Sequence, residues 1–433
     1  DIDEAINSGG LTEDISTYRV NKWAALALKA RFCLFEGTYR KYHGINLEGH
    51  DYTYYLEEAA KAAKTIIDEG PYKLYSTKTP DKDYMMLFAQ ENASTEEYIL
   101  AIRNSYEAQV YHNATAYTLL PTQGRPGYTR KFINMYLKKD GTAFTDQEGW
   151  QTLPFTEEVK DRDPRLAQSI RTPGYKRIGA KRVQGPDLGV TITGYQPIKF
   201  VQDTTASGGQ IDRNDRSTCD MPVFRYAEVL LNYAEAKAEL GTLSDDDLNI
   251  TVNEIRSRVG MRGLDMNEAN KNIDWYLESK EYGYPNVTGP NQIVNAILEI
   301  RRERAVELIQ EGFRLQDLYR WKAGYCIDQA ISGMYFPGPG EYKLAGKETA
   351  DLILYAAGST KPQGGEGVSV YELGSDIILS EGDKGYVYYH KTVENLRTPF
   401  NEERDYLYPI PSGERSLNPN LTQNPGWSDG LDF

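Results

Sequence analysis

Apolar residues recur at helical spacing in two neighbouring stretches near the start of the chain. In residues 22–36 they fall at i, i+3, i+4, i+7 and i+11, as one face of an α-helix requires. A second stretch covers about 53–69 and stops at Gly70, whereas the first is expected to end at Gly37. Small alanines on both faces allow a close approach. The pattern over about 22–70 therefore predicts an antiparallel helical hairpin of the tetratricopeptide type.

A second hairpin is predicted over about 225–260. Its first helix covers 225–240, and its partner covers about 248–259, where apolar residues again follow helical spacing. Three consecutive aspartates, 245–247, lie between the two helices. They could bind calcium, but their place at the start of a helix favours capping and compensation of the helix dipole.

The longest helical pattern covers 292–322. Gly312 is predicted to separate two helices there, and Trp321 is predicted to belong to the core. The charged run Arg301–Arg304 could form a basic site. We expect instead a solvated helix face, in which the arginine stems cover apolar surface and the head groups pair with neighbouring glutamates.

Two irregular regions, about 100–220 and 323–400, separate the helical stretches. They are rich in Gly, Pro, Tyr and Asp, and they contain short β-prone runs such as Val190–Thr193 and Tyr386–Tyr389. Loops of this length in a compact protein are usually functional. The pattern predicts a mainly α protein in which helices build the scaffold, a few short strands are added, and the loops carry the site.

The end of the chain, 406–427, combines many prolines and glycines with large apolar side chains. Prolines fix φ and bias their predecessors toward extended backbone, so a long helix is excluded. Disordered tails are usually poor in aromatic residues. This tail is therefore predicted to pack down as ordered turns.

Composition narrows the classes of function. The net charge of −14 argues against binding to nucleic acid or to an anionic bilayer. No apolar run approaches the ~20 residues that a membrane-spanning helix needs. The chain has 33 tyrosines and only 4 histidines. Tyrosine offers an apolar face and a hydroxyl group at little entropic cost, which suits partly hydrated polar ligands, although many tyrosines in a helical protein simply pack.

Catalytic and metal-binding signatures are mostly missing. The three cysteines are far apart and imply no disulfide framework, and no His-Glu-x-x-His or other metal-ligand spacing occurs. Residues 426–430 fit Gly-x-Ser-x-Gly, but no histidine follows the serine, so we interpret the match as coincidence. A glycosidase needs two carboxylates, and nothing among 63 acidic residues selects a pair. We therefore expect no enzyme, no cofactor and no metal.

Five segments in order along the chain resemble the SusD/RagB family of nutrient-binding outer-membrane lipoproteins of Bacteroidetes. The match to residues 221–236, Met-Pro-Val-Phe-Arg-Tyr-Ala-Glu-Val-Leu-Leu-Asn-Tyr-Ala-Glu-Ala, is very close. The others are the first hairpin with its Ile66–Leu74 end, the turn Asp161–Leu166, the block Arg302–Trp321 and the tail. The chain is identified on these residues as a member of that family.

The resemblance implies a single SusD-like domain over 1–433 that catalyses no reaction. Such a protein captures oligosaccharides at the cell surface, or peptides in the RagB-like branch. It sits as a lid on a TonB-dependent, SusC-like transporter and is anchored in the outer membrane by an N-terminal lipid. The family's lipoprotein signal, acylated cysteine and two earlier helical repeats are not found in this chain. We therefore expect that region, and part of the ligand site, to be missing.

The candidate ligand site is loop 104–128 of the first irregular region, where aromatic rings alternate with planar polar groups, and Trp150 in another loop is a second candidate. Sugar C–H faces pack on aromatic rings, while sugar hydroxyls exchange hydrogen bonds with polar side chains. An ordinary surface loop whose tyrosines pack on the scaffold is the alternative. A group around Trp275, with Tyr276, Tyr282 and Tyr284, is a further candidate that could also be packing. The predicted ligand-binding residues are Asn104, Tyr106, Tyr111, His112, Arg125, Tyr128 and Trp150.

Overall fold

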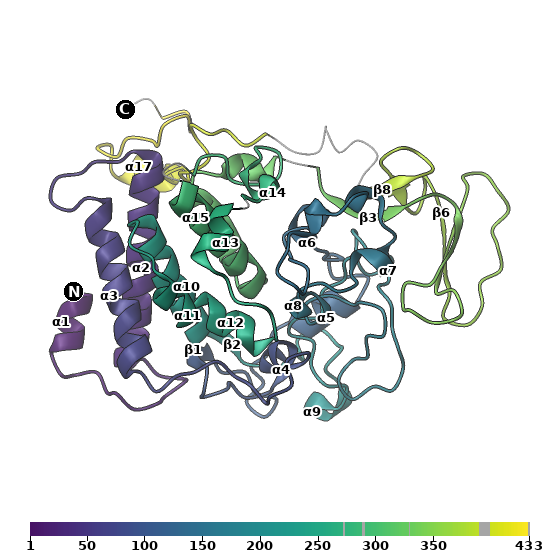
Figure 1. Cartoon of the computed structure of the whole chain (residues 1–433), viewed down its shortest axis with the longest axis horizontal. Helices are drawn as coiled ribbons and strands as arrows, with labels where there is room; N and C mark the ends of the chain where they lie inside the picture. Colours follow the sequence, from purple (N-terminus) through teal and green to yellow (C-terminus); the bar gives the residue numbers. More distant parts are fainter. Residues whose placement is uncertain (272, 288–290, 329, 389–398, 432–433) are drawn as a thin grey trace.

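Long helices pack side by side in one half of the molecule (Figure 1). The computed structural model describes residues 1–431 apart from 272, 288–290, 329 and 389–398. Helices α2 (Lys22–His43) and α3 (Tyr52–Glu69) form the first predicted hairpin, and α10 (Tyr226–Glu239) packs against both of them. On its other side α10 contacts α15 (Asn291–Glu307). Small side chains at these contacts let the helices approach closely, as the alanine pattern predicts.

Helix α2 does not end at Gly37, which corrects the sequence-based prediction. It continues to His43 and ends at Gly44, which has a φ of 65°. Gly37 lies where α2 crosses α3: a Cβ atom there would be 2.9 Å from Leu56 Cγ. The glycine serves the close approach of two helices rather than a helix stop.

The partner of α10 is two short helices, not the single helix predicted over about 248–259. These are α11 (Asp245–Asn249) and α12 (Val252–Arg258). Ser244 and Asp247 form a capping box at the start of α11, so capping explains the aspartates. The Thr251 hydroxyl donates to the Asp247 carbonyl at 2.6 Å, where the chain turns from α11 into α12.

Arg301–Arg304 is not a solvated face, and that prediction is wrong. Arg301, Arg302 and Arg304 are each at most 2% exposed. Arg302 pairs with Glu299 of the same helix at 3.2 Å, so the predicted pairing with a neighbouring glutamate is confirmed there. The other partners lie beyond the helix: Arg304 Nε lies 2.9 Å from Asp317 Oδ2, and Arg301 packs against the Trp321 ring, 4.4 Å from its centroid. The sequence shows that charges lie on a helix, but it does not show that other helices cover that face with carboxylates.

Gly312 separates α15 from α16 (Arg314–Arg320) as predicted, with a φ of +87°. Trp321 is fully buried, as predicted. The remaining helices are short and lie in the connections. They are α1 (Ile2–Asn7), α4 (Asp83–Ala89), α5 (Ala114–Leu119), α6 (Arg130–Ile133), α7 (Phe155–Glu158), α8 (Pro164–Ala167), α9 (Ala206–Gly209), α13 (Met266–Lys271), α14 (Trp275–Glu278), α17 (Ser412–Leu417), and the 3₁₀ turns η1 (Phe144–Asp146), η2 (Trp150–Thr152) and η3 (Gly324–Ile327).

The described strands form three small sheets. One is the antiparallel pair of β1 (Tyr98–Ile102) and β2 (Met221–Arg225). The antiparallel sheet β3-β8-β7 joins β3 (Ser332–Phe336), β8 (Gly385–Tyr388) and β7 (Ile378–Leu379). In the third sheet, β5 (Leu352–Tyr355) pairs antiparallel with β4 (Gly340–Tyr342) and parallel with β6 (Ser369–Glu372).

Of the two β-prone runs, one forms a strand. Tyr386–Tyr388 lies in β8, while position 389 is outside the described residues. Val190–Thr193 is not a strand, because the Val190 and Thr191 amides donate to the Asp187 carbonyl in a turn. The run is apolar because the turn is buried, not because it pairs in a sheet.

The tail after position 398 is held in turns by its own side chains. Gln423 bonds both backbone groups of Ile410, at 2.7 and 2.9 Å. Arg415 donates to the Leu421 carbonyl at 2.9 Å, and Trp427 Nε1 donates to the Leu407 carbonyl at 2.9 Å. The tail is therefore ordered, as its apolar content predicts.

Candidate functional site

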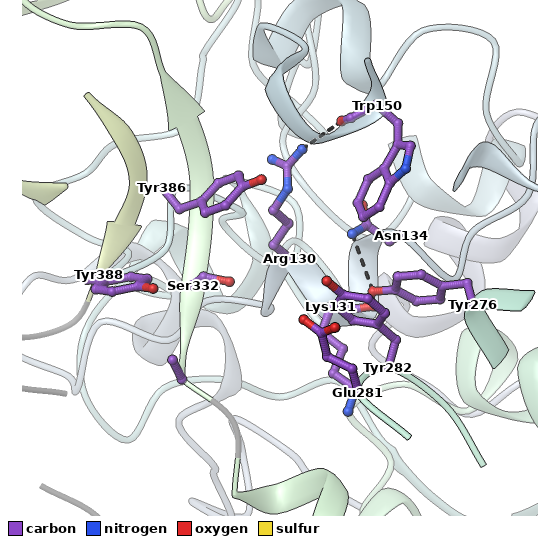
Figure 2. A pocket seen from close by; sticks show the side chains of 11 residues that line it. Arg130, Lys131, Asn134, Trp150, Tyr276, Glu281, Tyr282, Ser332, Tyr386 and Tyr388 are labelled. Atoms are coloured by element: carbon purple, nitrogen blue, oxygen red, sulfur yellow. Dashed lines mark hydrogen bonds between the residues drawn. The ribbon is translucent and has the colours of Figure 1, made fainter. Parts of the chain in front are cut away.

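A pocket of about 350 Å³ opens between α6 with η2 on one side and β3 with β8 on the other (Figure 2). Segments that are far apart in the sequence meet here, including the turn after α14. The pocket is lined by Arg130, Lys131, Asn134, Trp150, Tyr276, Glu281, Tyr282, Ala330, Ser332, Tyr386 and Tyr388.

Aromatic rings form two facing walls of this pocket (Figure 2). On β8, Tyr386 and Tyr388 are half-buried, while Val387 between them is buried in the core, as alternation along a strand requires. On the opposite side, the Trp150 ring meets Tyr276 edge-on at 5.9 Å and Tyr282 edge-on at 6.4 Å. Tyr276 and Tyr282 stack at 4.5 Å with an interplanar angle of 7°. Tyr282, Tyr386 and Tyr388 are half-buried, whereas Trp150 and Tyr276 are buried. The aromatic surface open to the pocket therefore comes mainly from the three half-buried tyrosines.

Arg130 ties the two walls together. Its guanidinium donates to the carbonyl oxygens of Trp150 and Gln151, each at 3.0 Å, and it lies 4.8 Å from the centroid of the Tyr386 ring. A salt bridge to buried Glu158, at 3.0 Å, balances its charge. Arg130 therefore fixes the pocket's geometry and adds little net charge to it.

Polar groups form the floor of the pocket. Asn134 donates from Nδ2 to the Tyr276 hydroxyl at 3.3 Å, and that hydroxyl donates to the Lys131 carbonyl at 3.1 Å. Asn134 Oδ1 is buried without a hydrogen-bond partner among the described residues, so it remains available as an acceptor. An unpaired buried acceptor is costly, and a ligand hydroxyl group would satisfy it.

Lys131 supplies the pocket's other cation. Burial lowers the pKa of its ammonium group, and the Arg314 guanidinium lowers it further, while Cys326 and Glu281 oppose the shift. Glu281 is the one carboxylate among the described residues that line the pocket. In the part of the chain that the structure describes, no group of three or more His, Cys, Asp or Glu side chains could hold a metal ion. The site combines aromatic faces with hydrogen-bonding groups and is close to neutral.

Comparison with known proteins identifies the family that has this architecture. A model of the SusD family matches residues 86–427, which is most of the chain. The chain belongs to the SusD family. No curated protein matches it significantly.

Solved structures share the fold of this SusD-family chain. A SusD-like carbohydrate binding protein from Bacteroides fragilis NCTC 9343 is 22% identical, with a TM-score of 0.61 over 97% of this chain and 69% of that one. A SusD-like protein from the same organism is 20% identical, with a TM-score of 0.58 over 98% of this chain and 69% of its own. These similarities confirm the mainly α, SusD-like fold that the sequence predicts.

Of the seven predicted ligand residues, Trp150 lines the aromatic pocket. Asn104 and Tyr106 line a different, polar pocket of about 470 Å³ beside β1. The backbone N–H of Asn104 donates to the Asp220 carboxylate at 2.7 Å. The side-chain amide of Asn104 donates to the Cys219 carbonyl at 3.2 Å. Asn104 is thus engaged with the scaffold, whereas Tyr106 is 39% exposed.

The other four predicted residues are held by contacts within the protein. The Tyr111 hydroxyl donates to the Tyr106 carbonyl at 3.1 Å, and His112 Nε2 lies 2.8 Å from the Cys219 carbonyl oxygen. Arg125 donates to the Leu188 carbonyl. Tyr128 is buried and donates to the Gln310 side chain. The fold therefore does not gather loop 104–128 into one surface.

Several pocket residues were not among the predicted seven. Tyr276 and Tyr282 belong to the further candidate group around Trp275, and both line the pocket. Trp275 is 43% exposed and touches the Trp150 ring, whereas Tyr284 is buried in the core. Alternation in the run 386–388 could have pointed to its two tyrosines. Arg130, Lys131 and Asn134 carry no such signal, because they lie on a four-residue helix and at its C-cap, too short a stretch for periodicity to be read.

Proposed function

We propose that this protein binds oligosaccharides in the aromatic pocket and passes them to a TonB-dependent, SusC-like transporter of the outer membrane. The observation that carries the proposal is the pair of aromatic walls, Trp150 with Tyr276 and Tyr282 facing Tyr386 and Tyr388, over a polar floor. Membership of the SusD family and a fold shared with a SusD-like carbohydrate binding protein support it.

Sugar rings suit this pocket for physical reasons. Their C–H faces pack against tyrosine and tryptophan rings, and their hydroxyl groups both donate and accept hydrogen bonds. Asn134 Oδ1 offers an acceptor without a partner among the described residues, and the hydroxyl of Ser332 lies at the opposite wall. Because Arg130 is anchored to Trp150 and Glu158, little side-chain entropy is lost when a ligand binds.

We propose a binding protein rather than a glycosidase. Glycoside hydrolysis needs two carboxyl groups about 5–10 Å apart across the scissile bond. Glu281 is the one carboxylate among the described residues that line the pocket, and it has no second acid beside it there. A product released from an oligosaccharide on incubation with the protein would contradict this proposal.

Titration calorimetry against neutral oligosaccharides tests the binding proposal. We expect saturable binding that weakens about fivefold in Tyr388→Ala, because one lost ring contact costs about 1 kcal/mol. Because Tyr388 is only half-buried, the melting temperature of the variant should stay within a degree or two of that of the native protein. Tyr408→Ala, at a tail tyrosine that is 72% exposed, is the matched control and should bind normally.

Two results would redirect the proposal. Equal affinity in Tyr388→Ala, Tyr386→Ala and the control would show that sugars bind elsewhere, and the polar pocket at Asn104 and Tyr106 would be the next candidate. Failure of all oligosaccharides, with peptides recovered by mass spectrometry from the protein purified from its native cells, would establish the RagB-like alternative.

We also propose that the protein works at the cell surface as a lipid-anchored lid on its transporter. Family membership supports this placement. No helix among the described residues is long and apolar enough to cross a membrane. Affinity purification from detergent-solubilised outer membranes should recover a TonB-dependent transporter in a fixed ratio. Recovery of the protein without one would count against the partnership.

A further inference from the structure

Arg171 is a buried arginine without a carboxylate partner among the described residues, and it lies 5.8 Å from the centroid of the Tyr175 ring. Its side chain is 8% exposed, and among the buried arginines that the structure describes, only Arg171 and Arg162 form no salt bridge. Both terminal nitrogens of Arg162 are satisfied by carbonyl oxygens at 2.7–2.8 Å. The Nε atoms of both arginines lack a hydrogen-bond partner among the described residues, but the Arg171 guanidinium makes only one hydrogen bond there, to the Gly185 carbonyl at 3.1 Å.

The Arg171 side chain lines a pocket of about 220 Å³, where the loop 182–187 meets the sheet β4-β5-β6. Two further cations, exposed Arg182 and half-buried Lys347, line the same pocket and form no salt bridge with a described residue. Arg182 lies against the backbone at Gly367, where a Cβ atom would be 2.5 Å from its Nη2. Glycine at this position therefore gives the guanidinium its room.

The two carboxylates of this pocket are already engaged by the protein. Asp351 accepts hydrogen bonds from the backbone amides of Leu344 and Ala345, at 3.0 and 2.7 Å. Asp187 accepts from the Gly189 amide at 2.8 Å and from the Tyr371 hydroxyl at 3.4 Å. Neither is within salt-bridge distance of the three cations. The three cations that line the cavity outnumber its two carboxylates by one, in a chain whose net charge is −14.

We propose that this pocket binds a small oxyanion, a carboxylate or a sulfate group, independently of the aromatic pocket. The planar guanidinium forks of arginine match the geometry of such anions, and hydrogen bonds between charged partners are about twice as strong as neutral ones. The cavity has room for on the order of seven waters at ~30 Å³ each, enough for one such group. It shares no lining residue with the aromatic pocket.

The anion could be free in solution or carried by an acidic saccharide, and the same assay separates the two sources. Binding is measured by titration calorimetry at constant ionic strength, set with sodium chloride. The ligands are sodium sulfate, glucuronate and, as a neutral counterpart, glucose. Sulfate binding without glucuronate binding indicates a free inorganic anion, whereas binding of glucuronate but not glucose indicates an acidic sugar. Either result supports an oxyanion site.

Substitutions at the pocket provide the decisive comparison. Arg182→Gln and Lys347→Gln lie at its open side, so both should fold, and each should weaken anion binding at least fivefold. Arg171→Gln should weaken it further, provided that its melting temperature shows a folded protein. Lys361→Gln removes an exposed lysine outside the pocket and should bind like the native protein. The absence of saturable anion binding, or an equal loss in Lys361→Gln, would overturn the proposal.

Discussion

Gly37 shows how one missing side chain positions two helices. A Cβ atom at this position would lie 2.9 Å from Leu56 Cγ and 3.1 Å from its backbone nitrogen. Because a backbone atom is involved, a rotamer change alone cannot relieve the clash, and α2 and α3 would have to move apart. The helix therefore accepts the ~1 kcal/mol that an interior glycine costs relative to alanine.

Gly37→Ala should therefore destabilise the protein although it improves helix propensity. We expect a net loss of about 1–2 kcal/mol in the free energy of unfolding, measured by urea denaturation, because overpacking costs typically 1–3 kcal/mol. Gly413→Ala is the matched control, since Gly413 is an exposed glycine of α17 with no atom within 4 Å of an added Cβ. It should gain a few tenths to ~1 kcal/mol. Changes of the same sign in both variants would contradict this explanation.

At the residue scale, the sequence indicates which residue types could bind a sugar, but not where they meet. Trp150 lines the aromatic pocket, and ligand binding by any of the seven residues stays a prediction. Loop 104–128 looked equally suitable, but Tyr128 turns into the core and bonds Gln310. Whether a tyrosine faces a cavity depends on how closely α6 packs against β8, which lies about 250 residues further along the chain. The local spacing of residues does not predict that contact.

At the scale of elements, helices were predictable wherever one face is apolar and the other polar. Helix α10 departs from this pattern because nearly all of its residues are buried, including Glu228, Glu235 and Glu239. The partners of those acids come from helices far along the chain. Glu235 lies 2.7 Å from Arg320 Nη2 of α16 and accepts from Trp321 Nε1 at 2.7 Å. These ion pairs set the register between helices, and the sequence shows only their charges.

The pair of Glu235 and Arg320 predicts how stability depends on pH. Burial alone would raise the pKa of Glu235, but Arg320 outweighs it and lowers the pKa from 4.5 to about 2. The stabilisation is therefore complete above pH 4.5 and is lost as the pH falls toward 2. A shift of this size corresponds to about 3 kcal/mol.

Glu235→Gln isolates that contribution. At pH 7 it should cost about 3 kcal/mol, because buried Arg320 loses one of its two carboxylate partners and keeps only Asp317. The difference between variant and native protein, from urea denaturation, should then shrink by about 2 kcal/mol between pH 5 and pH 2.5. Asp68→Asn removes an exposed i, i+4 pair with Lys64 and should cost less than ~0.5 kcal/mol. A difference for Glu235→Gln that stays constant with pH would exclude this origin.

At the scale of the whole molecule, the tail packs against the end of the first long helix, α2, and against the short helix α16. The Tyr406 ring lies 4.7 Å from His43 at the end of α2 and 5.7 Å from Tyr319 of α16, both edge-on. Its hydroxyl accepts from the buried Gly324 amide at 2.8 Å and donates to Glu402 at 2.6 Å. Tyr406 of the tail thus contacts the end of α2, helix α16 and the 3₁₀ turn η3.

Tyr406→Phe keeps these ring contacts and removes only the hydroxyl group. The Gly324 amide would then be buried without an acceptor, so we expect a loss of about 1–3 kcal/mol in the free energy of unfolding. Hydrogen exchange at that amide should also accelerate, which a loss of general packing alone would not localise. Tyr408→Phe, at the exposed tyrosine two residues later, should leave both quantities unchanged. If Gly324 exchanges at the native rate in Tyr406→Phe, the tail is held by its aromatic contacts, and the hydroxyl plays no part in closing it.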